Sequence, residues 1–354
     1  MKIKFCKDYH TYDRFWNTLE MNYAAMLVSS GFPVDRTGLN NIYDIEYDKI
    51  PEDHFTSLSF EECCMEAASK IWLLNRPVCL FWSGGIDSTA AAIALLETKG
   101  KDDVLSFICT NDSINEFPEF YEKIMDDCDV INILNKSIFS NHDIIKVTGE
   151  CGDQLFGSDS MSDKQHLIRD EWHSTYKWDF SLLYPDQNKK VKGEFFEKNR
   201  NKFFEFLISH VDMCPFKIKT VFDLYWWINF TIKWENVNTR ILFIRMNTNE
   251  WKSTIPFFNT DNFQRWSITN HDIKQKGSWK TYKQPAKDFI HKYFADENYR
   301  KNKLKVPSLI KVDIPQRYTP NLIKLCLSDG RTWRNNEKID TDILNFLKIN
   351  REEL

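Results

Sequence analysis

The sequence has no long hydrophobic run, no Cys-x-x-Cys pair and no large charge excess of one sign. Its apolar runs fall short of the roughly 20 residues that a membrane-spanning helix requires, and residues Met1–His10 turn polar too soon for a secretory signal. The nine cysteines are scattered and include no Cys-x-x-Cys pair, which argues against a disulfide framework and a zinc ribbon. We therefore expect a cytoplasmic protein without a membrane partner.

The charge balance argues against a nucleic-acid partner. The formal net charge is −4, and Lys and Arg are spread along the chain. Such a chain produces no overall field that would attract nucleic acid or an anionic membrane. Nucleic acid is accordingly not expected as a partner.

The abundant residues are those of a packed globular core. Hydrophobic residues make up 42% and aromatic residues 15% of the 354 residues, which is enough apolar surface for a substantial core. The aromatic residues concentrate around residues 222–234, at helical spacing. Such a stripe is more typical of a buried helix face than of a ligand platform.

Turn-forming residues and changes in composition divide the chain into three expected parts. Residues 1–70 are expected to form a small N-terminal appendage, residues 71–310 the main domain, and residues 311–354 tail helices. Within the main domain, a helical subdomain is expected from about residue 160. A helix is predicted to begin at Ser57 or Ser59, because acidic residues and then apolar residues at helical spacing follow.

Between residues 78 and 147, short apolar runs alternate with helical patterns, as they do in βαβ units. Runs that are apolar on both faces are typical of parallel strands covered by helices on both sides. We therefore predict the α/β class, with a parallel, doubly wound sheet and a helix-rich C-terminal half. Ligands of such sheets bind at the carboxyl ends of the strands. The predicted strands are 78–82, 104–109, 130–134 and 144–147, and the predicted helices between them are 89–99 and 117–128.

A glycine-rich loop follows the first predicted strand. Residues Ser83–Ser88 read Ser-Gly-Gly-Ile-Asp-Ser and open a helix, so backbone N–H groups and the helix N-terminus face one point. This pattern predicts a phosphate-binding loop, although the Walker A spacing and its lysine are missing. Asp87 is assigned to Mg²⁺, because a carboxylate in an anion site needs an intervening cation. The other nucleotide-binding candidates are Gly84 and Gly85, for close backbone approach, and Ser83, Ser88 and Thr89, for their hydroxyl groups.

The loop resembles that of the N-type ATP pyrophosphatases (PP-loop enzymes), which include asparagine synthetase, β-lactam synthetase, GMP synthetase, NAD synthetase and tRNA-thiolating enzymes. The resemblance implies an adenine nucleotide alpha hydrolase-like (HUP-like) fold that binds ATP and Mg²⁺. It also implies cleavage of ATP between the α and β phosphates, so that the substrate becomes an adenylate. Adenine is then expected near Leu105–Cys109, which makes Cys109 a nucleotide-binding candidate.

A second motif follows the fourth predicted strand. Residues 147–157 read Val-Thr-Gly-Glu-Cys-Gly-Asp-Gln-Leu-Phe-Gly and resemble the asparagine synthetase pattern Thr/Ser-Gly-Glu-Gly-Ser/Ala-Asp-Glu-Leu-Phe-Gly. The match implies that Asp153 is the second Mg²⁺ ligand beside Asp87. It also implies that Gly149 lies at the nucleotide and that Glu150 faces the acyl-adenylate and the incoming amine. Helix capping is the structural alternative for the two acids.

Three positions depart from that pattern. Cys151 replaces a glycine, Gln154 replaces a glutamate, and Asp159 stands where a tyrosine often follows. ATP and metal binding stay predicted, whereas the use of aspartate as the substrate is left open.

Two weaker resemblances lie downstream. Residues 255–259, Ile-Pro-Phe-Phe-Asn, resemble the family's Val-Pro-Phe-Leu-Asp stretch, and residues 299–307 resemble its Arg-x-Lys-x-x-Phe-x-x-Pro segment. The second match implies that Lys301 contacts the leaving pyrophosphate, where a cation offsets the developing negative charge. Arg300 and Lys303 are close competitors for that role, and a solvated basic loop is the alternative.

The resemblance is to the synthetase domain of asparagine synthetase and β-lactam synthetase and covers about residues 75–310. Lys283 matches a lysine that precedes the family's C-terminal helices and joins Glu150 and Lys301 as a predicted catalytic residue. Class II glutaminase domains begin with a cysteine directly after the initiator methionine, whereas this chain begins Met1-Lys2-Ile3. Nitrogen is therefore expected from free ammonia, from a separate glutaminase or from an amine on the substrate.

These features together predict an ATP- and Mg²⁺-dependent carbon–nitrogen ligase that acts on a small carboxylate. One alternative is an enzyme of nucleobase or tRNA modification, including sulfur transfer, for which Cys109 and Cys151 are the available thiols. The other is a non-catalytic nucleotide-binding relative, which would be expected to have lost Asp87, Asp153 or Lys301.

Overall fold

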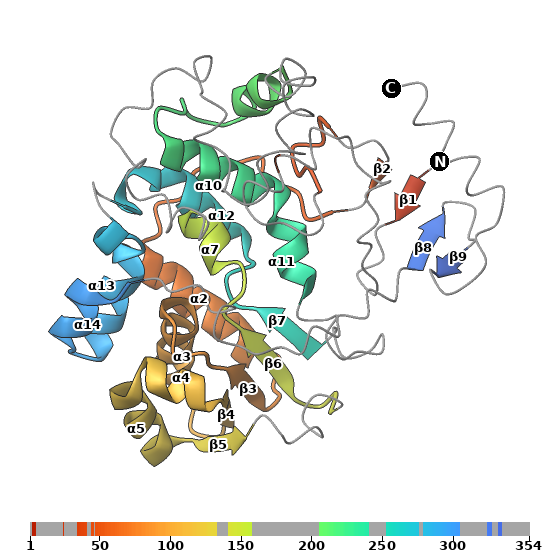
Figure 1. Cartoon of the computed structure of the whole chain (residues 1–354). Helices are drawn as coiled ribbons and strands as arrows, with labels where there is room; N and C mark the ends of the chain where they lie inside the picture. The colour runs from red at the N-terminus through yellow and green to blue at the C-terminus, as the bar shows by residue number, and fades with distance from the viewer. Residues whose placement is uncertain are drawn as a thin grey trace, which may run out of the picture. The chain divides into compact units, whose positions relative to one another are not determined.

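The computed structural model describes residues 2–4, 24, 34–40, 44–45, 47–132, 141–157, 205–240, 253–275, 279–304, 324–327 and 332–334 (Figure 1). The chain forms two compact units, each made of separate stretches of sequence. Unit 1 comprises Met1–Ile50, Arg169–Ile244 and Pro315–Leu354, and unit 2 comprises Pro51–Ile168 and Arg245–Ile314. In the described ranges, none of the helices has the length and apolar character needed to cross a bilayer.

Unit 2 is built on a five-stranded sheet with the order β5-β4-β3-β6-β7. All four pairings of neighbouring strands are parallel. Because β4 and β5 lie on one side of β3 while β6 and β7 lie on the other, the strand order reverses between β3 and β6, which is where open α/β sheets bind ligands. The strands are β3 (Val78–Phe81), β4 (Leu105–Cys109), β5 (Asp129–Asn132), β6 (Ile145–Thr148) and β7 (Thr254–Pro256).

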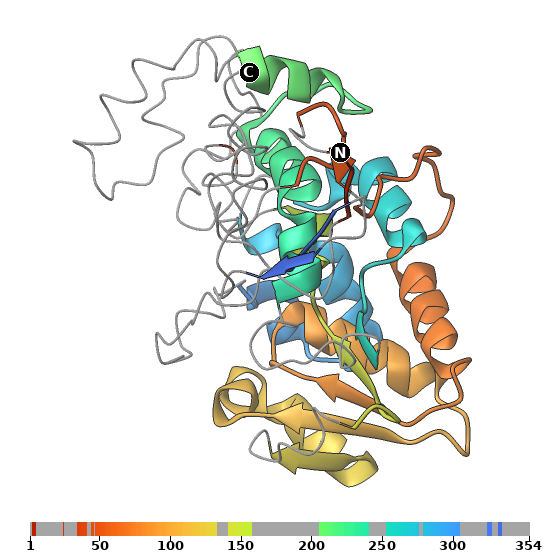
Figure 2. The same cartoon turned by 90° about the vertical axis from the view of Figure 1, so that its right-hand side faces the viewer.

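Helices of unit 2 pack beside this sheet and against one another. Helix α2 packs on α3, and α13 contacts both; Figure 2 shows the sheet and its neighbouring helices after a quarter turn. The helices are α2 (Phe60–Trp72), α3 (Ile86–Thr98), α4 (Asn111–Glu116), α5 (Pro118–Asp127), α7 (Gly152–Phe156), α12 (Asp261–Thr269), α13 (Gln284–Tyr293) and α14 (Glu297–Asn302), with 3₁₀ turns η6 (His271–Ile273) and η7 (Trp279–Thr281).

An aromatic cluster joins the helices that surround the second motif. The ring of Phe60, at the start of α2, lies 5.2 Å from that of Phe156 at the end of α7 and 5.1 Å from that of Trp266 in α12. The rings of Phe258, two residues after β7, Phe263 of α12 and Phe289 of α13 also lie next to that of Phe60. Aromatic side chains bury large apolar areas, so this cluster fixes α7 against the rest of unit 2.

The α/β class and the parallel sheet are confirmed, and the sheet order is consistent with a doubly wound fold. The four predicted strands and both predicted helices exist, with ends that differ by a few residues. The sequence analysis missed β7, which lies at the resemblance to residues 255–259, and the short helix α4. Whether the fold is of the adenine nucleotide alpha hydrolase type stays a prediction.

Unit 1 has a four-stranded sheet with the order β2-β1-β8-β9. Its strands are β1 (Lys2–Lys4), β2 (Asp44–Ile45), β8 (Lys324–Leu327) and β9 (Thr332–Arg334), and its helices include α10 (Val221–Ile232) and α11 (Trp234–Arg240). The aromatic stripe is a core element as predicted, since Trp226, Trp227, Phe230 and Trp234 are buried.

The expected domain boundaries do not coincide with the two compact units. Helix α2, which crosses the expected boundary at residue 70, belongs entirely to unit 2. The two described stretches of the C-terminal tail, which was expected to be helical, are strands β8 and β9. The start of the expected helical subdomain, at about residue 160, lies outside the described residues. The boundaries at 70 and 310 stay predictions, because a compact unit need not fold independently.

The helix predicted to begin at Ser57 or Ser59 is α2, and Ser59 is its N-cap. The Ser59 hydroxyl accepts a hydrogen bond from the Glu62 backbone N–H (3.2 Å), and the Glu62 carboxylate accepts one from the Ser59 N–H (2.7 Å). Together these bonds form a capping box.

We expect Ser59→Ala to lower the free energy of unfolding by about 1 kcal/mol, because the helix loses its capping oxygen. Ser57→Ala is the matched control and should stay within about 0.5 kcal/mol of the wild type, because Ser57 is an exposed residue outside the capping box. Urea unfolding of both variants measures the difference. Equal losses at the two serines would contradict the assigned cap.

Candidate functional site

Serine hydroxyl groups shape the glycine-rich loop between β3 and α3. The Ser88 hydroxyl accepts a hydrogen bond from the Ser83 backbone N–H (3.1 Å), lies 3.0 Å from the Ser83 hydroxyl and donates to the Gly85 carbonyl (3.2 Å). Gly85 is the N-cap of α3. Ser83 is exposed, whereas Ser88 is buried. Ser83 is therefore the hydroxyl that a ligand reaches first.

Gly84 lies directly against helix α4. Its φ is +74°, and a Cβ at this position would lie 2.3 Å from the Ser113 carbonyl oxygen and 2.6 Å from the Glu116 Cβ. Only glycine fits both the backbone conformation and the space. The loop therefore has α4 as one wall.

Thr89 differs from the other predicted phosphate ligands. It is buried, and its hydroxyl oxygen accepts a hydrogen bond from the Trp82 indole N–H (3.1 Å). This contact ties α3 to the end of β3. The Thr89 hydroxyl thus has a structural partner already.

Two predicted metal ligands and one predicted catalytic residue meet at a single point. The Lys283 ammonium (Nζ) lies 2.5 Å from the Asp87 carboxylate and 2.6 Å from the Asp153 carboxylate. The Lys283 side chain has no exposed surface, and those of Asp87 and Asp153 are 14% and 18% exposed. The structure thus brings together two negative charges and one positive charge in a largely buried cluster.

The sheet explains why the two aspartates are close. Asp87 lies in the first turn of α3 and Asp153 in the first turn of α7, and these helices follow the neighbouring strands β3 and β6. Figure 1 shows α7 leading on from β6. A Cβ on Gly152 would lie 2.5 Å from the Asp87 carboxyl carbon, and one on Gly149 would lie 2.9 Å from the Ser88 backbone nitrogen. The two glycines therefore allow the second motif to approach the first loop.

Buried hydrogen bonds hold Lys283 in place. Its backbone N–H donates to the Lys274 carbonyl (3.0 Å), and its φ is +59°. The Lys274 ammonium donates to the Ser267 hydroxyl (2.8 Å), which donates to the Leu155 carbonyl in α7 (2.6 Å). The segment that carries Lys283 is therefore tied to the helix that carries Asp153.

Two aromatic rings lie near the Lys283 ammonium. The Lys283 Nζ lies 5.8 Å from the ring centroid of Phe156 and 5.5 Å from that of Tyr282. Both distances allow cation–π attraction. Sequence reasoning missed these two residues, although Phe156 lies within the second motif.

The donor groups fit a Mg²⁺ ion that is bound together with a nucleotide. Within the described ranges there is no cluster of three or more His, Cys, Asp or Glu side chains that would form a complete protein metal site. Mg²⁺ usually binds one or two carboxylates and completes its coordination with water and substrate phosphates. The Lys283 ammonium acts as a stand-in cation between Asp87 and Asp153, so these two carboxylates are the residues that would hold the ion.

The three basic candidates around residue 301 have different surroundings. Lys301 is 67% exposed and pairs with Glu297 on its own helix (2.9 Å). Arg300 pairs with Asp288 (2.7 Å). Lys303, one residue beyond the end of α14, is 15% exposed and pairs with Glu116 (2.5 Å).

Because Glu116 also lies against Gly84, Lys303 is the basic residue of this segment that the structure places beside the glycine-rich loop. The Lys287 ammonium, one turn after Lys283 in α13, donates hydrogen bonds to the backbone carbonyls of Lys280 (2.5 Å) and Lys303 (3.3 Å). The second bond holds the backbone of Lys303 next to α13. Burial lowers the pKa of Lys287 to about 8, and the nearby Asp288 opposes that shift. Sequence reasoning missed Glu116, which precedes the predicted helix 117–128.

The remaining predicted residues lie at the strand ends. Glu150 is half-buried in the loop between β6 and α7, and its backbone N–H donates to the Thr148 hydroxyl (3.4 Å). Cys109 is the last residue of β4, and Cys151 is the buried N-cap of α7 with a φ of 69°. Burial raises the pKa of the Cys109 thiol to about 12, and Cys79 adds to that shift.

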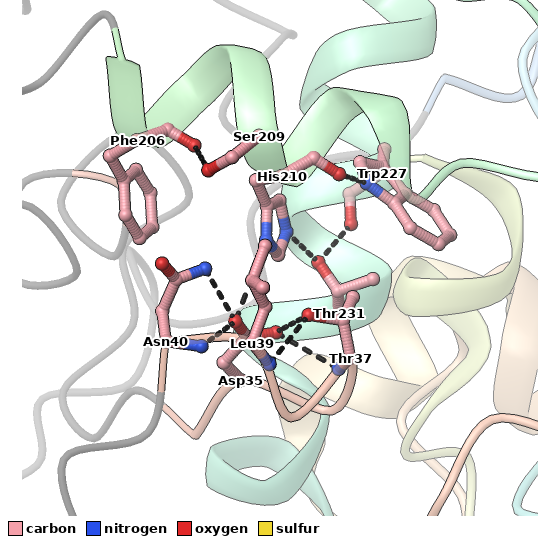
Figure 3. A network of polar contacts seen from close by, with 9 residues as sticks. All are labelled: Asp35, Thr37, Leu39, Asn40, Phe206, Ser209, His210, Trp227 and Thr231. Carbon is pink, nitrogen blue, oxygen red and sulfur yellow. Dashed lines mark hydrogen bonds and ion pairs between the residues drawn. The ribbon is translucent and has the colours of Figure 1, made fainter.

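Unit 1 contains a separate buried polar network (Figure 3). The imidazole of His210 lies 3.7 Å from the Asp35 carboxylate and 2.7 Å from the Thr231 hydroxyl. Burial raises the pKa of Asp35, but the contact with His210 and the hydrogen bonds from Thr37 and Asn40 outweigh it and hold this pKa well below its usual range. The side chains of Asp35 and His210 have no exposed surface. The network joins a loop to two helices in the core of unit 1.

We expect Gly84→Ala to lower the free energy of unfolding by about 2 kcal/mol or more, because it adds backbone strain and overlap with Ser113. Gly85→Ala is the control, since its φ is −78° and its Cβ would meet only the Ser83 hydroxyl, at 3.3 Å. That variant should lose less than about 1 kcal/mol. Thermal unfolding measures both, and a loss in Gly85→Ala as large as that in Gly84→Ala would refute the assigned packing.

No protein-family model matches the chain, and no curated protein matches it either. The resemblance in sequence accordingly rests on the two glycine-rich motifs and the shorter downstream segments. What the geometry adds is the contact among Asp87, Asp153 and Lys283.

Proposed function

We propose that the protein is an ATP- and Mg²⁺-dependent ligase that adenylates a small carboxylate, releases pyrophosphate and forms an amide with ammonia or an amine. The observation that carries this proposal is the buried Lys283 ammonium between Asp87 and Asp153, at the carboxyl ends of two neighbouring parallel strands. Paired carboxylates beside a glycine-rich loop at such a point suit the binding of a metal–nucleotide complex.

Each residue of the cluster has a role in the proposal. The backbone of Gly84 and Gly85 and the hydroxyl of Ser83 bind phosphate oxygens at the N-terminus of α3. Asp87 and Asp153 orient the metal–nucleotide complex, and Mg²⁺, when bound, offsets the negative charge of the phosphates. The ammonium of Lys301 or Lys303 stabilises the negative charge that develops on the departing pyrophosphate.

The reaction proceeds in two steps. A substrate carboxylate oxygen bonds to the α-phosphorus while the bond from that phosphorus to the pyrophosphate oxygen breaks. The amine nitrogen then bonds to the acyl carbon, AMP departs with the former carboxylate oxygen, and the nitrogen loses a proton. We assign acceptance of that proton to Glu150, in the loop between β6 and α7. The amine comes from free ammonia, from a separate glutaminase or from the substrate itself.

The burial of the cysteines weakens the alternative of sulfur transfer. Such chemistry requires an accessible thiolate, whereas Cys109 and Cys151 are 6% and 1% exposed. With its pKa raised to about 12 by burial, the Cys109 thiol stays protonated at neutral pH. The presence of Asp87, Asp153 and Lys301, one or more of which a non-catalytic relative would be expected to lack, likewise favours an enzyme.

Pyrophosphate release tests the proposed reaction. With ATP, Mg²⁺, pooled small carboxylates and ammonia, we expect stimulated release by the wild type and a roughly 10²-fold or larger loss in Asp87→Asn, because a metal ligand contributes several kcal/mol to the transition state. Asp102→Asn, in the exposed turn before β4, is the control and should match the wild type. If no pool stimulates release, or if Asp87→Asn is fully active, the ligase proposal fails.

Paired lysine variants identify the residue that contacts pyrophosphate. We expect Lys303→Ala to reduce kcat/KM by roughly 10²-fold, because Lys303 pairs with Glu116 beside Gly84. Lys301→Ala should change kcat/KM far less, since Lys301 pairs with Glu297 on its own helix. Steady-state pyrophosphate release measures both, and the reverse order would return the role to Lys301.

A further inference from the structure

Lys283 occupies the position between Asp87 and Asp153 that a bridging metal ion would need. Its ammonium lies 2.5 Å and 2.6 Å from the two carboxylates. Mg²⁺ binds oxygen at roughly 2.0–2.1 Å, so an ion on the same two oxygens would lie at most about 4.6 Å from the ammonium, a separation at which two cations repel each other. The ammonium and the metal ion therefore compete for the same two carboxylate oxygens.

The surroundings make displacement of the ammonium costly. The Lys283 side chain is fully buried, and the rings of Phe156 and Tyr282 lie near its ammonium in addition to the two carboxylates. Aromatic rings attract a cation but do not replace two charge-assisted hydrogen bonds. A free metal ion that took both carboxylates would leave a buried ammonium without an anionic partner, which proteins avoid.

A nucleotide changes this balance because it brings its own anionic oxygens. The glycine-rich loop lies at the N-terminus of α3, in whose first turn Asp87 lies. A polyphosphate bound there would supply acceptors for the displaced ammonium and further ligands for the metal ion. Metal and nucleotide together satisfy every charge of the cluster, whereas the metal ion alone does not.

We infer that Lys283 closes the metal position in the absence of nucleotide, so that the metal ion enters only together with a polyphosphate that takes over the ammonium. Lys283 is in this respect a positioning residue that sets the order of binding. The inference rests on the proposed function for the metal site at Asp87 and Asp153 and for the nucleotide, and it extends that function by excluding a preloaded metal site.

Mn²⁺ binding without nucleotide, measured by electron paramagnetic resonance, tests the inference without any turnover. We expect Lys283→Gln to bind Mn²⁺ about tenfold or more tightly than the wild type, and the double variant Lys283→Gln, Asp153→Asn to lose that gain. Lys280→Gln, an exposed lysine on the same segment, should behave as the wild type does. Equal affinities of the wild type and Lys283→Gln, or no measurable binding to a folded Lys283→Gln, would overturn the inference.

The unaltered protein provides a second measurement, should Lys283→Gln fail to fold. In wild-type crystals soaked with Mn²⁺ alone, we expect no anomalous peak between Asp87 and Asp153, and we expect one when α,β-methylene ATP is also present. A peak with Mn²⁺ alone, or none with both, overturns the inference. Failure of pyrophosphate release would instead overturn the proposed ligase reaction, so the two failures are distinguishable.

Discussion

The contact of one buried ammonium with two carboxylates is the constraint on which the candidate site depends. Removing one partner from a buried ion pair typically costs about 3–5 kcal/mol, because a charge is left without compensation. Asp87 and Asp153 carry like charges at the ends of neighbouring strands, and Lys283 is the cation that allows both to stay there. The three segments that carry Asp87, Asp153 and Lys283 are therefore held together by this contact.

The hydrophobic core sets the geometry of this contact. Phe156, at the end of the helix that carries Asp153, packs against Phe60 and Trp266, and its ring also faces the Lys283 ammonium. One side chain thus joins the core to the charged cluster. Because protein interiors are close-packed and transmit small displacements, changes in this aromatic cluster would alter the distance between the two carboxylates.

Sequence reasoning found the elements of the site more reliably than their arrangement. Strand periodicity and glycine-rich turns identified the loops that carry Asp87 and Asp153, because these signals are local. The adjacency of β3 and β6 follows from sheet order, which no local pattern encodes.

The contact of Lys283 with both aspartates likewise joins segments about 130 and 196 residues apart. Lys301 and Lys303 are separated by the end of α14, so a helix boundary decides which of them turns toward Glu116. Boundaries are the least reliable part of a prediction from sequence.

Backbone strain at the cluster agrees with a pre-organised site. Among the described non-glycine residues, positive φ occurs at Asn75, Cys151 and Lys283. Asparagine adopts this conformation readily, whereas the other two residues cost of order 1–3 kcal/mol each. Cys151 precedes the helix that carries Asp153, at a position where the pattern it resembles has glycine, and Lys283 is the ammonium itself. Such conformations persist only where the surrounding structure over-determines them, and at Lys283 the contacts with Asp87 and Asp153 and the backbone hydrogen bond to Lys274 supply that constraint.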